Sequence, residues 1–467
     1  MNYRKILSVC SLLVFDIVIL IIAYLLSYFL RTKFFSIFFH ELTLSLSFQI
    51  FISRFYLVVP YILVFAYEGL YTKRLEFWEE TRRLWKGNLI ATAVVMIILY
   101  ITKGFIVSRA IVILVFMINL ILLPIERNLV KQLLFKLQLW TKNLLLIGSK
   151  LTIERLLNEI NRHPILGYKP IAQIETQSNI SDSSPKNIIN SFQNILELGK
   201  IDSIVVDAHE LDQLQILEIY KQSEGKVDDF FVIPALSQLQ TAGVEIEQLE
   251  TILLMKFRYN LLSRESQIAK RIIDLTIAGL GLIICLPTIG IISLLTKITS
   301  PGPVFFIQQR IGKNKSLFPC YKFKTMYLDA PKRLENFLNS SPEAKMTWEK
   351  YLKITNDPRV TPLGRFLRRT SLDELPQLWN VLKGDMSLVG PRPYLPYEVE
   401  NIEKKMGSIT RVKPGVTGLW QVSGRSQLPF EERLQLDEYY VKNWSIWTDL
   451  VILVKTIKVF IKAEGAY

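Results

Sequence analysis

The sequence predicts a membrane protein of mixed α and α/β structure with three parts. These are a four-helix transmembrane bundle at 1–140, a Rossmann-like α/β domain at 141–255, and a mixed, mainly α monotopic domain at 264–467 with a re-entrant membrane helix at 272–296. Long apolar runs, one stretch of alternating strands and helices, and a basic C-terminal part predict this order. Of the 467 residues, 50% are hydrophobic and only 21% are charged, whereas soluble domains carry about 25% charged residues.

Four apolar runs in the first part have lengths near the roughly 20 residues that a spanning helix needs. The runs are Ile6–Leu30, Phe48–Ala66, Leu84–Ile101 and Val107–Leu123. Four buried helices of a soluble core are the alternative, but the runs are too long and their loops too short for it. Lysine and arginine are densest before the first run, between the second and third, and after the fourth. The positive-inside rule therefore places both ends of the bundle, and everything after Lys142, in the cytoplasm.

The middle part alternates strand and helix patterns, which is typical of a small doubly wound parallel sheet. A helix is expected at Thr152–Ile160, and the expected strands are Asn143–Gly148, Tyr168–Ile174, Ser203–Val206 and Phe230–Ile233. A dinucleotide site would need a G-x-G-x-x-G turn after the first strand. Only Gly148 is present there, so we expect no NAD or FAD, and an interaction or regulatory module is favoured.

A fifth apolar run, Ile272–Thr296, has basic residues at both ends and Pro287 near its middle. A straight crossing would export the basic C-terminal part, and proline kinks a helix. We therefore interpret the run as a helix, a break and a second helix that return to the same membrane face. An ordinary fifth span is the alternative. Farther along, Trp444–Lys462 has a lysine stripe at helical spacing, which predicts an amphipathic helix on an anionic lipid surface. A core-facing helix with a solvated lysine edge remains the alternative.

The net charge is +14, and most of it lies after Ser300. Such an excess implies an anionic partner, and arginine forks match phosphate oxygens. Nucleic acid is disfavoured because no binding motif and no platform of aromatic and basic residues is present. Phosphorylated small molecules beside a lipid bilayer fit better.

Within this basic part, Asp373 and Glu374 precede Pro376. Proline fits the first turn of a helix, which predicts Asp373 as the N-cap. An ionised carboxylate beside arginines can act as a nucleophile toward phosphorus or as a Mg²⁺ ligand, and Glu374 can share the metal or handle a proton. Helix capping with ion pairing, including a Ser371/Glu374 capping box, remains the alternative reading.

Several motifs follow one another in order along 264–467. They are Lys270-Arg271-x-x-Asp274, Ser300-Pro301-Gly302-Pro303, Tyr321-Lys322-Phe323-Lys324, Asn356-Asp357-Pro358-Arg359, Ser371-Leu372-Asp373-Glu374-Leu375-Pro376-Gln377, Gly390-Pro391-Arg392-Pro393 and Lys413-Pro414-Gly415. Together they resemble the bacterial polyprenyl-phosphate sugar phosphotransferases, and the front and middle parts are similar to the long form of that family. The stretch from Tyr439 to Tyr467 resembles the undecaprenyl-phosphate galactose branch.

The resemblance implies a reaction, a cofactor and a set of site residues. A UDP-sugar gives its sugar-1-phosphate to undecaprenyl phosphate and releases UMP, with Mg²⁺, as the first membrane step of O-antigen, capsule or exopolysaccharide synthesis. It implies Asp373 as the nucleophile and a metal ligand, with Glu374 assisting. The substrate-binding residues that it implies are Arg368, Arg392, Lys270, Arg271 and Asp274.

Alternatives remain at three levels. Galactose is favoured over glucose by the C-terminal resemblance alone. A membrane-anchored nucleotide-sugar dehydratase or epimerase would need the glycine fingerprint that is missing at Gly148. A catalytically inactive scaffold for polysaccharide assembly would tolerate loss of Asp373, Glu374 or Arg392, yet all three are present. We expect the inner bacterial membrane with the catalytic domain on its cytoplasmic face, and a homodimer through the middle domain is compatible with the sequence.

Overall fold

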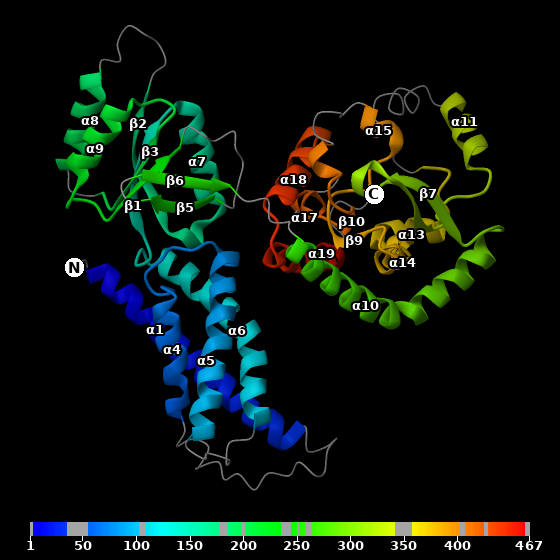
Figure 1. Ribbon diagram of the computed structural model, residues 1–467, viewed down its shortest axis with the longest axis horizontal. Helices are drawn as coiled ribbons and strands as arrows, with labels where there is room; N and C mark the ends of the chain where they lie inside the picture. The colour runs from blue at the N-terminus through cyan, green and yellow to red at the C-terminus, as the bar shows by residue number, and fades with distance from the viewer. Residues whose placement is uncertain are drawn as a thin grey trace. The chain divides into compact units, whose positions relative to one another are not determined.

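The computed structural model divides into two compact units, Met1–Gln238 and Leu239–Tyr467. Figure 1 shows the helices and strands of each unit in chain order. The residues that the structure describes are 3–34, 55–101, 109–176, 185–197, 201–234, 244–249, 252–257, 264–340, 357–400, 407–424 and 428–462.

The first unit begins with a bundle of apolar helices. The helices are α1 (Tyr3–Phe29), α4 (Val59–Tyr67), α5 (Phe77–Ile101) and α6 (Arg109–Lys136). Those at Ile6–Lys33, Phe77–Ile101 and Ala110–Lys136 have the length and composition to cross a membrane. Of the predicted run Phe48–Ala66, only the part from Phe55 is described, and it is a shorter apolar helix, Phe55–Tyr67. Apolar helices are therefore found at the predicted runs wherever those runs are described.

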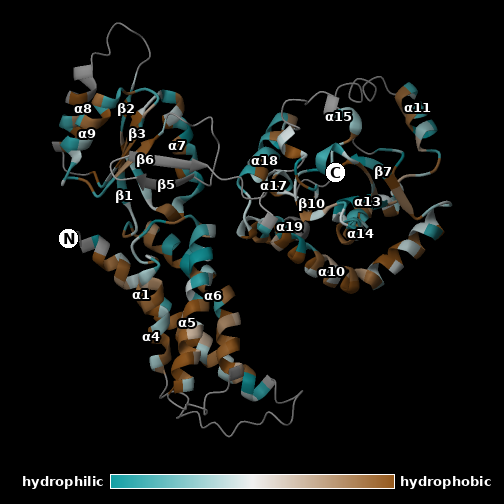
Figure 2. Cartoon of the chain, in the orientation of Figure 1, coloured by the Kyte–Doolittle hydropathy of each residue, from teal (hydrophilic) through white to brown (hydrophobic). Residues whose placement is uncertain are grey.

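Most of the length of the bundle helices is hydrophobic, as Figure 2 shows by its colour, and many of these side chains are exposed. Leu63 and Ile121 are 64% and 65% exposed, whereas Phe65 and Leu84 are buried between the helices. Soluble proteins rarely expose contiguous apolar patches larger than a few hundred Å². The exposed surface is therefore the kind that faces lipid.

Charged side chains are buried at one end of this bundle. Arg127 pairs with Asp16, whose carboxylate also accepts a hydrogen bond from the Tyr71 hydroxyl at 2.7 Å. Lys131 pairs with Glu80 at 2.7 Å. The first pair joins α6 to α1 and the second joins α6 to α5, so their role is to fix how the helices pack.

We expect Arg127→Met to lower the free energy of unfolding by about 3–5 kcal/mol, because it leaves the Asp16 carboxylate buried without its partner. Thermal unfolding of the detergent-solubilised protein measures the loss. The double variant Asp16→Asn/Arg127→Met removes both charges and should be more stable than the single variant. A double variant as unstable as the single one would contradict this account.

The α/β part of the first unit is a four-stranded sheet with strand order β2-β1-β3-β4 and all pairs parallel. The strands are β1 (Lys142–Gly148), β2 (Tyr168–Glu175), β3 (Ser203–Asp207) and β4 (Asp229–Ile233), and the helices are α7 (Lys150–Arg162), α8 (Pro185–Glu197) and α9 (Gln213–Ser223). Side chains of β1 alternate between the two faces: Leu144 and Leu146 pack with α7, and Leu145 and Ile147 with α8 and α9. The predicted strands and the doubly wound arrangement are confirmed.

Arg74, in the loop between α4 and α5, joins the bundle to the sheet. Its guanidinium donates to the Leu166 carbonyl at 2.6 Å. It also lies over the rings of Trp140 and Tyr168, at 4.5 and 5.6 Å from their centroids. Trp140 connects α6 to β1, so one side chain holds the loop of the bundle against the start of the sheet.

The second unit combines short strands with helices around a hydrophobic core. Its strands are β5 (Val244–Leu249), β6 (Ile252–Phe257), β7 (Phe305–Ile311), β8 (Leu317–Phe323), β9 (Ser387–Val389) and β10 (Gly415–Thr417). Its helices are α10 (Arg264–Thr299), α11 (Ala330–Ser340), α13 (Pro362–Thr370), α14 (Gln377–Lys383), α15 (Pro396–Glu400), α17 (Leu419–Ser423), α18 (Phe430–Lys442) and α19 (Ile446–Lys462). Tyr440, Trp444 and Ile452 pack against Val381 and Val389 in this core.

The long helix α10 bends in its middle, as Figure 1 shows, and both of its ends pack on the second unit. Near its start, Asp274 accepts a hydrogen bond from Ser387 at 3.0 Å. Near its end, Ile292 packs with Phe323 and Leu367. The middle is exposed and apolar, with Ile284 75% exposed. The helix is continuous through Pro287, so the predicted break is wrong, and a bend takes its place.

The C-terminal helix α19 has one face in the core. Ile452 is 1% exposed, and the Thr456 and Thr417 hydroxyls lie 2.8 Å apart. Val454 and Ile457 are exposed on another face. The core-facing alternative therefore holds for one side of the helix, while apolar residues remain on its outer side.

Candidate active site

Two cationic side chains reach the site from β8 and α13. Lys322 lies near the end of β8, and Arg368 lies in the last turn of α13. The Thr361 hydroxyl caps α13 by accepting from the Gly364 N–H at 2.8 Å. A Cβ at Gly364 would lie 2.1 Å from the Thr325 carbonyl oxygen, so only glycine permits this approach. The Arg368 Nε then donates to the Thr325 hydroxyl at 3.0 Å.

Asp373 lies inside a short 3₁₀ turn, Leu372–Glu374, and not at a helix N-cap. Ser371 has a left-handed backbone with φ 52° and closes α13, so the chain makes a separate turn before α14 begins at Gln377. The predicted N-cap is therefore wrong, and Pro376 is the residue that precedes α14. The Ser371 side chain makes no capping bond either, which also excludes the capping box.

The electrostatic environment makes Asp373 unusually basic for an aspartate. Burial and the neighbouring Glu374 raise its pKa to about 6, although Lys322 and Arg368 act in the opposite direction. The Lys322 ammonium donates to Glu374 at 2.6 Å. Burial alone would lower the pKa of Lys322, but Glu374 and Asp373 outweigh it and the pKa is raised. Lys322 therefore remains charged beside both carboxylates.

Glu374 and Lys322 line a polar cavity of about 190 Å³. The other lining side chains include Arg310, Arg392 and Trp420. The guanidiniums of Arg392 and Arg433 lie 5.7 and 5.3 Å from the centroid of the Trp420 ring. Burial and the charge of Arg392 lower the pKa of Arg310. The several cationic side chains around the cavity favour the binding of phosphate oxygens.

The turn that carries Arg392 is held by a buried carboxylate on α18. Asp437 accepts from the Arg392 backbone N–H at 3.1 Å and from the Tyr394 hydroxyl at 2.6 Å. Burial raises the pKa of Asp437 to about 7. Because the folded pKa lies above the unfolded one, the ionised form costs stability, and this cost appears as the pH rises from about 4 to about 7.

We expect Asp437→Ala to lower the free energy of unfolding by about 2–4 kcal/mol, because two buried donors lose their acceptor. Asp437→Asn keeps an acceptor oxygen and loses the charge. Its loss should be smaller, and its stability should no longer fall between pH 4 and pH 7. Chemical unfolding across that pH range distinguishes the variants, and a pH dependence that survives in Asp437→Asn would contradict the assignment.

The structure divides the predicted site residues into two groups. Asp373, Glu374 and Arg368 interact with one another, directly or through Lys322, and Arg392 shares a cavity with Glu374. The remaining three residues, Lys270, Arg271 and Asp274, line a second cavity that shares no lining residue with the first.

The residues of this second group make structural contacts at the start of α10. Lys270 pairs with Asp449 at 2.6 Å, and Arg271 donates to the last carbonyls of α14. Arg310 and Trp420 are site residues that the sequence did not single out. Arg310 is followed closely by Lys313 and Lys315 in the sequence, whereas no local signal marks Trp420.

Comparisons with known proteins identify the family of the chain. Residues 265–463 match the family model described as bacterial sugar transferase. The chain is 35% identical over 403 residues to the undecaprenyl-phosphate galactose phosphotransferase of Salmonella typhimurium, covering 85% of this chain and 84% of that protein. It is 33% identical over 403 residues to the UDP-galactose-lipid carrier transferase of Erwinia amylovora, covering 85% and 84%.

A third relative is the UDP-glucose:undecaprenyl-phosphate glucose-1-phosphate transferase of Escherichia coli. The chain is 30% identical to it over 334 residues, covering 68% of both. The Salmonella and Erwinia alignments extend over most of the chain and therefore beyond the catalytic part. The chain thus belongs to the bacterial sugar transferase family.

Proposed function

We propose that the chain transfers a sugar-1-phosphate, most simply galactose-1-phosphate, from a UDP-sugar to undecaprenyl phosphate and releases UMP. The observation that carries this proposal is the pair Asp373–Glu374 beside Lys322 and Arg368. A half-buried carboxylate with a pKa of about 6 is about 90% ionised at pH 7 and more basic than an exposed aspartate. The names of the relatives indicate the donor and acceptor classes.

Asp373 attacks the β-phosphorus of the UDP-sugar. The bond from that phosphorus to the bridging oxygen breaks, and UMP leaves with the α-phosphate. The sugar-1-phosphate remains on Asp373 as an acyl phosphate. An ionised oxygen of undecaprenyl phosphate then attacks the same phosphorus and restores the free carboxylate. No net proton is consumed in the two steps.

The cations around Asp373 stabilise charge that builds on the transferred phosphoryl group. Arg368 is fixed by Thr325 and faces the Asp373 side. Arg392 lines the adjoining cavity, where it suits the phosphate of the departing nucleotide. Glu374 is held by Lys322 and raises the basicity of Asp373 by repulsion.

Mg²⁺ fits this site as a shared cofactor of protein and substrate. Among the described residues, no group of three or more His, Cys, Asp or Glu side chains is placed to hold a metal. Mg²⁺ is commonly bound by one or two carboxylates with substrate phosphates and water completing its shell. Asp373 and Glu374 supply such carboxylates, and the repulsion between them favours a cation. When bound, the metal would neutralise diphosphate charge.

The geometry of α10 and the positions of the basic loops support the proposed membrane placement. A straight helix of 36 residues would extend about 54 Å, well beyond a bilayer core, whereas both ends of α10 pack on one unit. This supports a re-entrant helix that returns to the cytoplasmic face of the inner membrane. The α/β part, which has a single glycine after β1, is proposed as a Rossmann-like module without a cofactor, and a homodimer through it stays an expectation.

The donor is tested with the purified full chain, Mg²⁺ and undecaprenyl phosphate, with UDP-galactose or UDP-glucose in parallel. UMP release from UDP-galactose alone supports the galactose assignment. Release from UDP-glucose alone would replace galactose by glucose. No UMP from either sugar, in a chain that remains folded, would contradict the proposed donors.

The pKa of Asp373 near 6 predicts an acidic limb in the pH profile of kcat/KM. At pH 5 about one tenth of the carboxylate is ionised, so the rate should be about tenfold below its plateau. Phosphate groups of the substrates titrate in the same range. Glu374→Gln separates the two sources, because it removes the repulsion and should move the limb to lower pH. A limb that stays in place would assign it to the substrates.

A further inference from the structure

A second cavity of about 570 Å³ lies at the start of α10, within the second unit. Its walls are the first turns of α10, the turn at Lys313 and the segment Arg411–Lys413. The volume is in the range that holds a small ligand. It shares no lining residue with the cavity beside Glu374. The two cavities are therefore separate candidate binding sites.

Part of the charge in this cavity is already used by the protein. The Lys270 ammonium pairs with Asp449 at 2.6 Å, and the Arg271 guanidinium donates to the Val381 carbonyl at 2.6 Å. Asp274, the acidic residue of the lining, accepts from the Ser387 hydroxyl and the Leu388 N–H, both at 3.0 Å. These three residues therefore serve the packing of α10.

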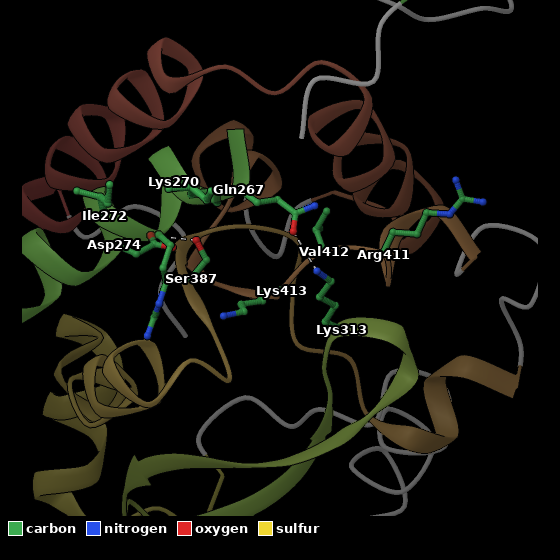
Figure 3. A pocket seen from close by; sticks show the side chains of 11 residues that line it. Gln267, Lys270, Ile272, Asp274, Lys313, Ser387, Arg411, Val412 and Lys413 are labelled. Carbon is green, nitrogen blue, oxygen red and sulfur yellow. Dashed lines mark hydrogen bonds between the residues drawn. The ribbon is translucent and has the colours of Figure 1, made fainter. Parts of the chain in front are cut away.

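Lys313 and Lys413 supply the remaining positive charge. Figure 3 shows that they come from different segments and that both side chains border the same cavity, whereas Arg411 points away. Lys313 donates to the neutral Gln267 side chain at 3.2 Å. Within the described part of the chain, neither lysine has a carboxylate in ion-pair distance. Burial, Arg271 and Lys313 lower the pKa of Lys413, whereas Asp274 and Asp385 act in the opposite direction. The two ammonium groups therefore attract an anion.

The same cavity has an apolar wall that faces outward. Ile268 and Ile272 both line it, one turn apart on α10, and are 61% and 60% exposed. Farther along the helix, Leu280 and Ile283 continue the exposed apolar surface. A free anion would make no favourable contact with these apolar side chains. A ligand with an anionic head and an apolar tail would use both walls.

We propose that this cavity binds the phosphate headgroup of an anionic membrane phospholipid, with Lys313 and Lys413 on the phosphate and the acyl chains along Ile268 and Ile272. This goes beyond the transfer reaction, because the lipid is neither donor nor acceptor. The bound lipid holds the first turn of α10 at the level of the bilayer headgroups. The bound lipid thereby positions the membrane helix without touching Asp373.

The test uses the full chain in a neutral detergent and native mass spectrometry of bound lipid. Dihexanoyl phosphatidylglycerol is compared with dihexanoyl phosphatidylcholine and with glycerol phosphate. We expect phosphatidylglycerol to bind best, and Lys313→Gln/Lys413→Gln to weaken it at least about tenfold, as for lost charge-assisted contacts. Lys413→Arg should retain binding. The control Lys221→Gln/Lys332→Gln removes the same charge at exposed lysines on α9 and α11 and should bind as the unchanged protein does.

Three results would overturn the proposal. The first is equal binding of phosphatidylglycerol by the double variant, with an unchanged melting temperature showing that it is folded. The second is equal binding of glycerol phosphate, which would indicate a site for soluble anions. The third is displacement of phosphatidylglycerol by undecaprenyl phosphate together with a higher KM for that acceptor in the double variant, which would make the cavity an acceptor site. Lipid binding is measured without turnover. The result therefore tests the lipid site independently of the proposed transfer reaction.

Discussion

Asp373→Asn is expected to lower the rate of UMP release by roughly 10⁴-fold or more, as loss of a nucleophile does in other covalent enzymes. Asparagine has nearly the size of aspartate and keeps an acceptor oxygen, so the 3₁₀ turn at Leu372–Glu374 should persist. What is lost is the ionised oxygen that forms the bond to phosphorus. Single-turnover release of UMP without acceptor measures this step, because the acyl phosphate then accumulates in an amount equal to the enzyme.

Glu374→Gln is the matched control, since it removes the neighbouring carboxylate by the same chemical change. It should keep the covalent adduct, detectable as an added hexose phosphate in the intact mass of the protein, while slowing the reaction. Asp373→Asn should show no adduct. An adduct of undiminished amount in Asp373→Asn would place the nucleophile elsewhere.

Arg368→Met is expected to reduce kcat/KM by about 10²–10³-fold, because a fixed cation that stabilises transition-state charge is lost. A second effect follows from the charge interaction between Arg368 and Asp373. Arg368 counteracts the increase of the Asp373 pKa, so its removal should move the acidic limb of the pH profile upward. The displacement is opposite to that expected for Glu374→Gln.

Arg369→Met serves as the control for Arg368→Met. Arg369 precedes Thr370 on α13 and is exposed, so the helix loses the same charge one position away from the site. Its activity and pH profile should remain near those of the unchanged protein. If Arg369→Met lost as much activity as Arg368→Met, the effect would come from the helix as a whole.

Much of the fold could be predicted because its signals are local and periodic. The β1 run Asn143–Gly148 and the apolar run Ile6–Leu30 carry their structure in consecutive residues, and both elements are found. The bend of α10 could not be placed in the same way. Proline predicts a disturbance, but whether the helix breaks or curves depends on how its two ends pack on distant segments such as Ser387 and Phe323.

The site was partly predictable for the same reason. Asp373 and Glu374 were proposed from the residues around them, but the N-cap interpretation failed because Ser371 adopts a left-handed backbone. That conformation is set by the end of α13 and not by the acidic residues. Lys322 and Asp437 act through contacts across 52 and 45 residues, respectively. Such partners appear only once the strands and helices are folded together.

Arg74 restricts the orientation of the α/β part relative to the apolar helices of the bundle. Its contacts with Leu166, Trp140 and Tyr168 leave little rotational freedom at the joint between α6 and β1. The edge strand β4 exposes Phe231 and Val232. A protein that docks along this edge meets a strand whose orientation relative to the apolar helices is restricted by Arg74. Association then loses less orientational entropy than between two freely diffusing molecules.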